Sequence, residues 1–486
     1  MKNFKYIWVA GLAVTLLIII GPILYFLPDQ SQDHDPWAYV PQPLPHTDHT
    51  ELMEGPYETG SDVTRACLEC HEDAARQMMQ TTHWTWESEP VMLEGRAEPV
   101  TIGKKNSINN FCIGIQSNWP PCTACHTGYG WFDADFDFSA EENVDCLVCH
   151  DTSGSYVKSK GGLPAEGVDL VAAAQSVGRP DRGSCGSCHF FGGGGNAVKH
   201  GDLDASLYNP PESVDVHMGK YDFVCIDCHQ TTDHQIKGRS LSVSVNNENQ
   251  VFCTDCHSED LHDDERITAH VQTVACQTCH IPYAAIKDAT KTHWDWSTAG
   301  LDIEEDPHDY LKIKGSFVYE EDIQPEYYWY NGTANRYILG DKIDPTQPTV
   351  LNPPHGSLSD PAAKIWPFKV HRANQIYDSV NNYLLNPTTA GEGGFWHDFD
   401  WDQAARLGSE AIGMEYSGSH DFTPTEMLWP ISHMTAAKDK ALQCDDCHSE
   451  EGRLDWQALG YDGDPMFRGG RVQTHPLPQP AAEEVN

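Results

Sequence analysis

The cysteines of this chain fall into one repeated pattern, and that pattern fixes their chemistry. Eight segments have the form Cys-x-x-Cys-His, and they use 16 of the 17 cysteines. The two sulfurs of such a segment can bond to the edge of a porphyrin, and the adjacent histidine then reaches the iron from one side as its proximal ligand. The sequence therefore predicts eight covalently attached c-type haems. Their cysteines are Cys67, Cys70, Cys122, Cys125, Cys146, Cys149, Cys185, Cys188, Cys225, Cys228, Cys253, Cys256, Cys276, Cys279, Cys444 and Cys447.

The histidines of the chain are numerous enough to bind most of these irons from both sides. Zinc is the weaker interpretation of the cysteines, because pairs of Cys-x-x-Cys segments would not each need a following histidine. Eight of the 25 histidines are proximal ligands, which leaves 17. The proximal histidines are His71, His126, His150, His189, His229, His257, His280 and His448. The distal ligands that we predict lie near a motif or among apolar residues, and they are His83, His217, His234, His262, His270, His371 and His433.

The remaining histidines rank lower as ligands. His200, His293, His397 and His420 are reserves, and His34, His46 and His49 lie in a polar stretch where solvation is expected.

If seven distal histidines serve seven irons, one iron lacks a second histidine and is the natural site of chemistry. Lys199, after a glycine-rich run, is the candidate ligand for that iron, since burial beside a metal lowers the pKa of an amine. The alternative is a solvated lysine. Cys112 is the cysteine that the motifs leave over, ten residues before Cys122. It is a reactive thiol or an inert buried one. Asn109, close to Cys112, is a candidate for a hydrogen bond to substrate.

The formal net charge is −41, which disfavours nucleic acid and anionic lipid as partners and favours basic redox proteins. The same acidity also serves solubility alone. Asp133, Asp135 and Asp137 form an acidic run that could bind calcium, although a solvated run is the simpler interpretation.

The elements that must position these residues divide the chain into five parts. Lys2 and Lys5 precede an uncharged apolar run at 6–27, so residues 1–28 are predicted to be a single-pass membrane anchor with the rest of the chain on the periplasmic face of the inner membrane. A cleaved signal peptide is the alternative. A proline-rich stalk (29–60), a haem core with seven motifs (61–290), a wrapping region with the eighth (291–470) and a tail (471–486) follow.

The expected fold is a multihaem cytochrome c built around stacked haems. We predict that it is mainly α, with much irregular loop, little β structure and the N-terminal transmembrane helix. Residues 360–385 show a plausible helical period.

From about residue 64 to 448 the chain resembles the octahaem cytochromes c of the tetrathionate reductase family. The resemblance rests on segments 82–86, 104–112 with 122–131, the glycine-rich run to 199–204, and 431–433 with 442–448. In that family one haem has a lysine as sixth ligand and a modified cysteine close by, and Lys199 and Cys112 hold the matching positions. The resemblance implies a reductase of small sulfur or nitrogen substrates such as tetrathionate, nitrite or hydroxylamine.

The electron donor expected for such a reductase is a quinol-oxidising membrane cytochrome. Two other interpretations stay open. One is a non-catalytic conduit from the quinol pool to external acceptors, and the other is an oxidase of hydroxylamine or a sulfur compound.

Overall fold

The computed structural model describes residues 11–12, 14–16, 35–43, 45–111, 114–241 and 244–469. The chain divides into two units, Met1–Gln42 and Pro43–Asn486. All eight haem motifs belong to the second unit.

The first unit does not support the predicted membrane anchor. Of the apolar run at 6–27 the structure describes residues 11–12 and 14–16. No helix of the described ranges is long and apolar enough to cross a bilayer. The prediction of a single-pass helix that holds the protein on the inner membrane is therefore corrected.

The region between the seventh and eighth motifs forms one eight-stranded sheet. The order of its main path is β4-β5-β3-β8-β10-β7, and β6 and β9 also pair with β8. The strands are β3 (Thr290–Asp295), β4 (Tyr310–Leu311), β5 (Gly315–Glu320), β6 (Glu326–Tyr330), β7 (Thr349–Val350), β8 (Lys364–Asp378), β9 (Tyr383–Leu384) and β10 (His420–Pro430). A separate hairpin joins β1 (Thr231–Thr232) to β2 (Gln235–Ile236). The predictions of little β structure and a mainly α fold are therefore wrong.

Strand β8 is the centre of this sheet. It pairs antiparallel with β10 from Asp378 opposite His420 to Phe368 opposite Pro430, and parallel with β3. Both of its faces are covered, and Arg372 is its one exposed residue. A strand buried on both faces loses the alternation of apolar and polar residues that identifies strands in a sequence. This explains why the helical prediction for residues 360–385 is wrong.

The helices are short, and the haem motifs lie on them. One helical turn places the two cysteines of a motif, three residues apart, on the same side of the backbone. The α-helices are α2 (Gly60–Leu68), α3 (Ala74–Met78), α4 (Thr82–Thr85), α5 (Trp119–Cys122), α6 (Leu147–His150), α7 (Leu170–Gln175), α8 (Arg182–His189), α9 (Val216–Lys220), α10 (Cys225–Cys228), α11 (Glu265–His270), α12 (Cys276–His280), α13 (Phe395–Asp398), α14 (Trp401–Ile412), α15 (Cys444–Cys447) and α16 (Pro465–Arg468).

Single 3₁₀ turns complete the helical structure. They are η2 (Thr123–Cys125), η3 (Glu141–Asn143), η4 (Lys160–Gly162), η5 (Ala205–Tyr208), η6 (Cys253–Asp255), η7 (Trp296–Thr298) and η8 (Lys438–Lys440).

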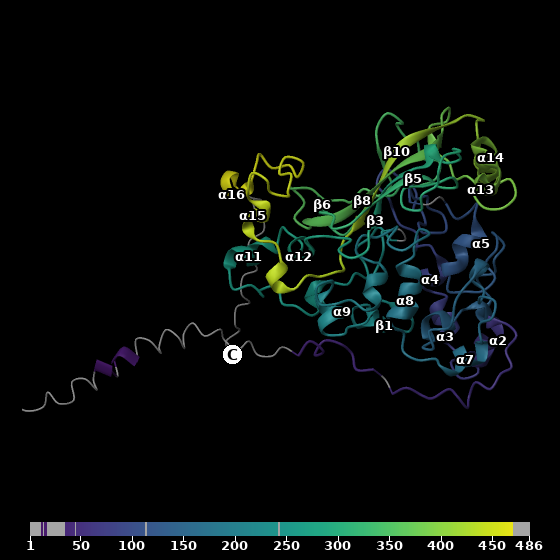
Figure 1. The fold of residues 1–486 in the computed structure, drawn as a ribbon, viewed down its shortest axis with the longest axis horizontal. Coiled ribbons are helices and arrows are strands. Elements are labelled where there is room, and N and C mark those ends of the chain that lie inside the picture. The colour runs from purple at the N-terminus through teal and green to yellow at the C-terminus, as the bar shows by residue number, and fades with distance from the viewer. Residues whose placement is uncertain are drawn as a thin grey trace, which may run out of the picture. The chain divides into compact units, whose positions relative to one another are not determined.

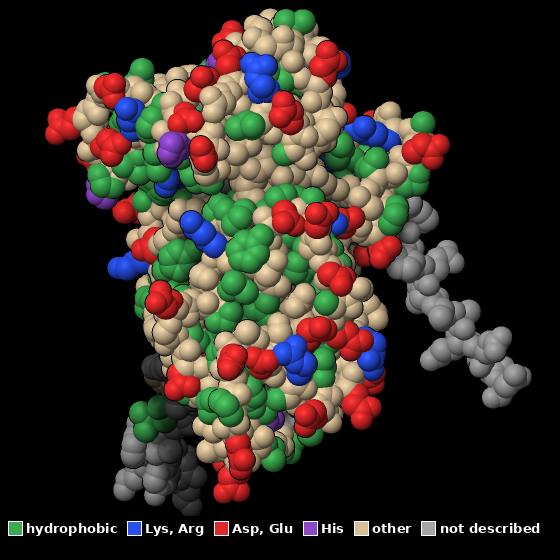
Figure 2. Space-filling model, turned by 90° about the vertical axis from the view of Figure 1, so that its right-hand side faces the viewer, with side chains coloured by type: hydrophobic (Ala, Val, Ile, Leu, Met, Phe, Trp, Pro, Cys, Tyr) green, Lys and Arg blue, Asp and Glu red, His purple; other side chains and the backbone are tan. Residues whose placement is uncertain are grey.

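The sheet and the haem-motif region are packed against each other. Figure 1 shows β3, β5, β6, β8 and β10 gathered together, with α3, α4, α8 and α9 on one side of them. A buried apolar cluster joins Trp294 and Trp429 of the sheet to Ile108, Phe111 and Val198 of the motif region. The segments that carry Asn109, Cys112 and Lys199 thus adjoin the sheet. Figure 2 shows carboxylates spread over one face of the molecule, with apolar side chains exposed between them.

Replacing Phe368 of β8 by alanine is expected to lower the free energy of unfolding by about 3–5 kcal/mol, because it empties a fully buried site. The ring packs against Tyr328 and Tyr330 at 5.7 and 5.5 Å between centroids. Guanidinium unfolding followed by circular dichroism measures the loss. The control is Arg372→Ala on the same strand, where exposed ion pairs to Glu326 and Glu426 are lost at a cost below about 1 kcal/mol. Equal losses in both variants would contradict the central role of β8.

Candidate haem ligands and catalytic site

Seven of the eight proximal histidines face a second histidine. The pairs, with the distance between ring centroids, are His71 and His49 (6.4 Å), His150 and His234 (6.5 Å), His189 and His83 (6.1 Å), His229 and His433 (6.2 Å), His257 and His217 (6.1 Å), His280 and His262 (6.2 Å), and His448 and His270 (6.2 Å). An imidazole nitrogen binds a metal at about 2.0–2.1 Å and its ring centroid lies about 1.2 Å further, so two imidazoles on one metal have centroids roughly 6.4 Å apart. Each pair therefore has the spacing of two ligands of one iron, and these residues would hold the haem iron.

The structure brings six predicted distal histidines into these pairs: His83, His217, His234, His262, His270 and His433. His371 is placed elsewhere. It lies fully buried on β8, and its Nδ1 is 3.1 Å from the side-chain oxygen of Asn110. The seventh pair instead contains His49, which we expected in solvent. Nothing in the proline-rich sequence around His49 marks this residue as a haem ligand, because only folding brings it close to His71.

The lower-ranked histidines take other places. His293 lies on β3 and His420 on β10, His397 on α13 is exposed, and the ring of His200 packs on Trp429 at 4.8 Å. His46 lies 5.7 Å from His49, and His34 is outside the described residues.

His126 is the proximal histidine that has no such partner among the described residues. Its ring is fully buried among aromatic side chains, and its Nε2 donates to the carbonyl oxygen of Trp84 at 2.7 Å. Burial lowers the pKa of His126 to about 3, so the ring is neutral at ordinary pH. The surrounding rings, with their centroid distances, are Trp131 (4.6 Å), Trp84 (5.1 Å), Trp86 (5.4 Å), Phe136 (5.4 Å) and Phe138 (6.2 Å).

Lys199 lies beside the motif that contains His126. Its charge interacts with the Cys125 thiol, and Cys125 lies near Cys188 at the end of α8. Its Nζ lies 4.8 Å from the centre of the Trp429 ring. Burial is the main cause that lowers the pKa of Lys199 to about 7, and the charges of Lys104 and Arg336 act in the same direction. A lysine in this position can lose its proton far more readily than one in water.

A glycine lets the loop before Lys199 approach the segment that contains Cys112. Gly193 has φ +89°, and a Cβ there would lie 2.7 Å from the Phe111 ring. The Phe111 ring in turn packs on Trp429 at 5.5 Å. Cys112 itself lies outside the described residues. The structure shows that its neighbour Phe111 and Lys199 both lie against Trp429. Asn109 accepts a hydrogen bond from Gln375 through its backbone oxygen at 3.1 Å.

Lys369 on β8 holds the backbone of Lys199 in place. Its Nζ donates to the carbonyl oxygens of Val198 and Lys199 at 3.0 and 3.2 Å, and to the Thr290 hydroxyl at 2.6 Å. The side chain is 1% exposed. Nothing in the sequence identified this lysine, because its neighbours Phe368 and Val370 make it look like part of an apolar run.

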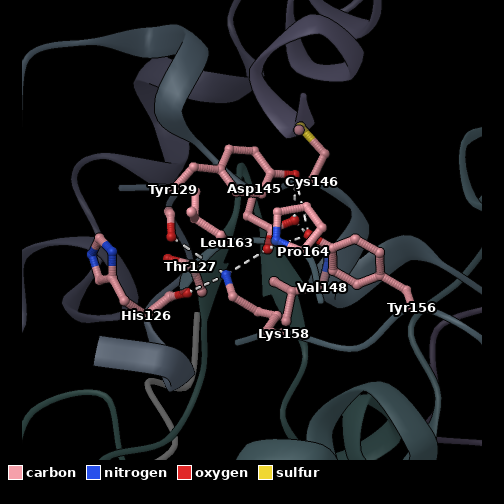
Figure 3. Close-up of polar contacts among 12 residues, drawn as sticks. His126, Thr127, Tyr129, Asp145, Cys146, Val148, Tyr156, Lys158, Leu163 and Pro164 are labelled. Atoms are coloured by element: carbon pink, nitrogen blue, oxygen red, sulfur yellow. Dashed lines mark hydrogen bonds and ion pairs between the residues drawn. The ribbon is translucent and has the colours of Figure 1, made fainter. Parts of the chain in front are cut away.

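A buried ion pair ties the motif of His126 to the following motif (Figure 3). Lys158 Nζ donates to the Asp145 carboxylate at 2.5 Å and to the carbonyl oxygen of His126 at 2.6 Å. The Asp145 carboxylate also accepts from the hydroxyls of Tyr129 and Tyr156 at 2.8 and 3.0 Å. Since Asp145 directly precedes Cys146, this network fixes the positions of two haem-binding segments relative to each other.

The cysteines of different motifs contact one another in a continuous series. Cys67 lies near Cys146, Cys125 near Cys188, Cys185 near Cys225 and Cys253 near Cys276. Electrostatic contacts join Cys149 to Cys185, Cys228 to Cys256 and Cys279 to Cys447. These contacts link all eight motifs, and the motif of His126 branches from that of His189.

The acidic run at 133–137 shows no built cation site. Asp133 and Asp137 accept hydrogen bonds from the backbone N–H groups of Asp135 and Ser139. The described part of the chain contains no cluster of three or more histidine, cysteine or carboxylate side chains that could hold a metal ion by themselves.

Comparison with known proteins places this chain in a family. The family described as "Cytochrome c bacterial" matches residues 291–451, and "Cytochrome c7 and related cytochrome c" matches residues 211–281. The crystal structure of an octahaem cytochrome c from Shewanella oneidensis is similar to this chain with a TM-score of 0.82 and 50% identity, over 87% of this chain and 98% of that one. An uncharacterized protein of Archaeoglobus fulgidus is 26% identical over 40% of this chain and 82% of its own length.

The variant Lys158→Met is expected to lower the free energy of unfolding by about 3–5 kcal/mol, because it leaves the Asp145 carboxylate buried without its cation. Thermal or guanidinium unfolding of the purified protein measures the loss. The matched control is Lys237→Met, which breaks a pair with Asp255 of similar length, 2.6 Å, in which both side chains are about one-third exposed. Its expected cost is below about 1 kcal/mol. If Lys158→Met is as stable as the control, the network does not brace the two motifs.

Proposed function

The chain belongs to the octahaem cytochromes c, and we propose from this that it is a reductase whose catalytic haem is held by Cys122, Cys125 and His126. The comparisons make it a multihaem oxidoreductase with covalently bound c-type haems. Seven haems with two histidine ligands each pass electrons to the eighth, where a small substrate such as tetrathionate, nitrite or hydroxylamine is reduced. The observation that carries this proposal is that His126 has no histidine partner among the described residues, whereas each of the other seven proximal histidines has one.

The two kinds of site have different chemistry. An iron with two imidazoles has no open position and serves electron transfer, whereas an iron with an exchangeable ligand can bind a substrate and supply it with electrons. We assign Lys199 as the sixth ligand at the second kind of site. The electrostatic interaction of Lys199 with Cys125 supports this assignment, and the hydrogen bonds of Lys369 to Val198 and Lys199 hold the Lys199 backbone in position.

Cys112 is proposed as the thiol that reacts with a sulfur substrate. As a thiolate it attacks the central S–S bond of tetrathionate, releases one thiosulfate and keeps the other as a mixed disulfide. Two electrons then release the second thiosulfate and restore the thiolate. Asn109 lies in the same segment and is proposed to donate a hydrogen bond to the substrate.

The electron donor is proposed to be a basic redox protein, of the kind that accepts electrons from a quinol-oxidising cytochrome. The net charge of −41 favours such a partner and its rapid association.

A non-catalytic conduit is the second candidate, and one observation favours it. The contacts between cysteines link all eight motifs into a series, as a redox wire would require. In that case Lys199 is a permanent ligand and no substrate reaches the iron. An oxidase of hydroxylamine or a sulfur compound would use the same site in the opposite direction.

Replacing His49 by alanine tests the one ligand pair, His49 with His71, that was not predicted from the sequence. The expected result is that one of the eight haems changes from low spin to high spin, because its iron loses one imidazole. Electron paramagnetic resonance and optical spectra of the oxidised protein measure the change. The neighbouring variant His46→Ala and the variant His371→Ala, which removes a buried histidine outside the pairs, are expected to leave all haem signals unchanged. A spin change in His371→Ala but not in His49→Ala would reverse the assignment.

Viologen-driven reduction of tetrathionate, nitrite and hydroxylamine tests the proposed function. The wild-type protein is expected to reduce at least one of them, and Lys199→Ala is expected to change its rate at least tenfold because the ligand of the catalytic iron is lost. Cys112→Ala is expected to abolish the reduction of tetrathionate. If the wild type reduces none of the three, the chain is a conduit. Full tetrathionate activity in Cys112→Ala removes the thiol from the mechanism and leaves the haem site standing.

A further inference from the structure

Arg336 is a buried cation whose hydrogen-bonding capacity is mostly unused. The residue is 4% exposed. Its Nη2 donates to the carbonyl oxygen of Ile108 at 3.1 Å, but Nε and Nη1 have no partner among the described residues. Arg336 and Asp341 line one surface hollow. The Asp341 carboxylate, however, pairs with Arg96 instead of Arg336. A guanidinium buried in this way is costly to the fold unless an anion completes its contacts.

The position of Arg336 connects it to the candidate catalytic site. Ile108, to which it donates, directly precedes the segment of Asn109 and Cys112. The charge of Arg336 also acts on Lys199, as does that of Lys104. Two cations, Arg336 and Lys104, therefore act on Lys199 from separate parts of the chain.

Lys104 is a second cation near the motif of His126. Its Nζ lies 4.2 Å from the centre of the Trp86 ring, beside His126, and its charge acts on Cys125 and His126. The neighbouring Lys105, by contrast, pairs with Glu87 at 2.7 Å. Like charges gathered in a poorly hydrated place repel one another strongly, and an anion between them removes that repulsion.

We propose that Arg336, together with Lys104, forms an oxyanion-binding site that receives the substrate beside Lys199 and the haem of His126. The guanidinium is planar, and its unpaired N–H groups match two oxygens of one sulfonate or nitrite group. A surface hollow of about 360 Å³ includes Arg336 in its lining, so this residue lies next to solvent-filled space. This inference rests on the proposed function for the identity of the anion as a sulfur or nitrogen substrate.

A carboxylate of a haem propionate has the same chemistry as an incoming oxyanion and could occupy Arg336 permanently. The two sources predict different results. A propionate partner makes the haem midpoint potential depend on Arg336 and leaves the affinity for added anions unchanged. A substrate site makes anion affinity depend on Arg336.

The experiment compares Arg336→Gln, Arg336→Lys and Lys104→Gln in the haem-loaded protein. Dissociation constants for tetrathionate, nitrite and unreactive sulfate are measured by calorimetric titration of the oxidised protein, and midpoint potentials by spectroelectrochemistry. KM and kcat are measured with reduced viologen. Arg336→Gln is expected to weaken anion binding about tenfold to a hundredfold, the loss of one or two hydrogen bonds to a charged group, with KM rising by a similar factor. Arg336→Lys is expected to recover part of this loss, and Lys104→Gln to weaken binding about twofold to fivefold.

The matched control is Arg239→Gln. Arg239 also has Nε and Nη1 without partners among the described residues, but its Nη2 donates to the Tyr330 hydroxyl at 2.6 Å and its charge does not act on Lys199. Anion affinity in this variant is expected to equal that of the wild type.

Unchanged anion affinity in Arg336→Gln overturns the proposal, and a shifted midpoint potential in the same variant then assigns Arg336 to a propionate. If Arg336→Gln does not incorporate eight haems, Arg336→Lys and the partly buried Lys104→Gln serve as the test, and unchanged affinity in both overturns it. If the wild type binds tetrathionate or nitrite in an Arg336-dependent way but reduces neither, the anion site stands and the proposed reductase function fails.

Discussion

The separation of 6.1–6.5 Å between seven pairs of imidazole rings is the constraint on which the rest of the fold depends. Each ring of a pair must lie on one side of a porphyrin, and most partners come from distant parts of the chain. His83 reaches His189, and His433 reaches His229 from beyond the whole sheet. Secondary structure is short in the motif region because the helices need only to present two cysteines and a histidine. Ligand geometry thus replaces much of the protein packing that a domain of this length would otherwise require.

The sheet supplies what the short helices cannot. Strand β8 runs through its centre and carries Lys369, which fixes the backbone of Lys199, and His371, which contacts Asn110. One contact reaches Lys199 and the other reaches the neighbour of Asn109, both from a rigid element. A site built on a central strand keeps its geometry better than one built on loops alone. The motif-free region is therefore a scaffold for the site as well as a cover for the haem core.

The electrostatics of the site oppose those of the molecule. The chain is strongly acidic, while the charge of Lys104 acts on both His126 and Lys199, and that of Arg336 acts on Lys199. A small anion is repelled by the exterior and attracted by the interior, whereas a basic protein is attracted by the exterior. The two kinds of partner that the proposed function needs, an anionic substrate and a basic electron donor, are in this way directed to different places.

The cofactors could be predicted from the sequence alone, and the proximal histidines and six of the seven histidines that the structure pairs with them could be named as candidate ligands, because these residues stand in local motifs or close to them. The sequence did not determine the sheet, since a strand covered on both faces has no readable period, and the prediction of a mainly α fold with a transmembrane helix was corrected. The structure does not describe Cys112, so its role rests on the family resemblance. The pairing of His49 with His71, the lack of a histidine partner for His126 among the described residues, and the surroundings of Lys199 were decided only by the tertiary structure. They depend on contacts between segments far apart in the chain, and the spacing of residues along a sequence contains no information about such contacts.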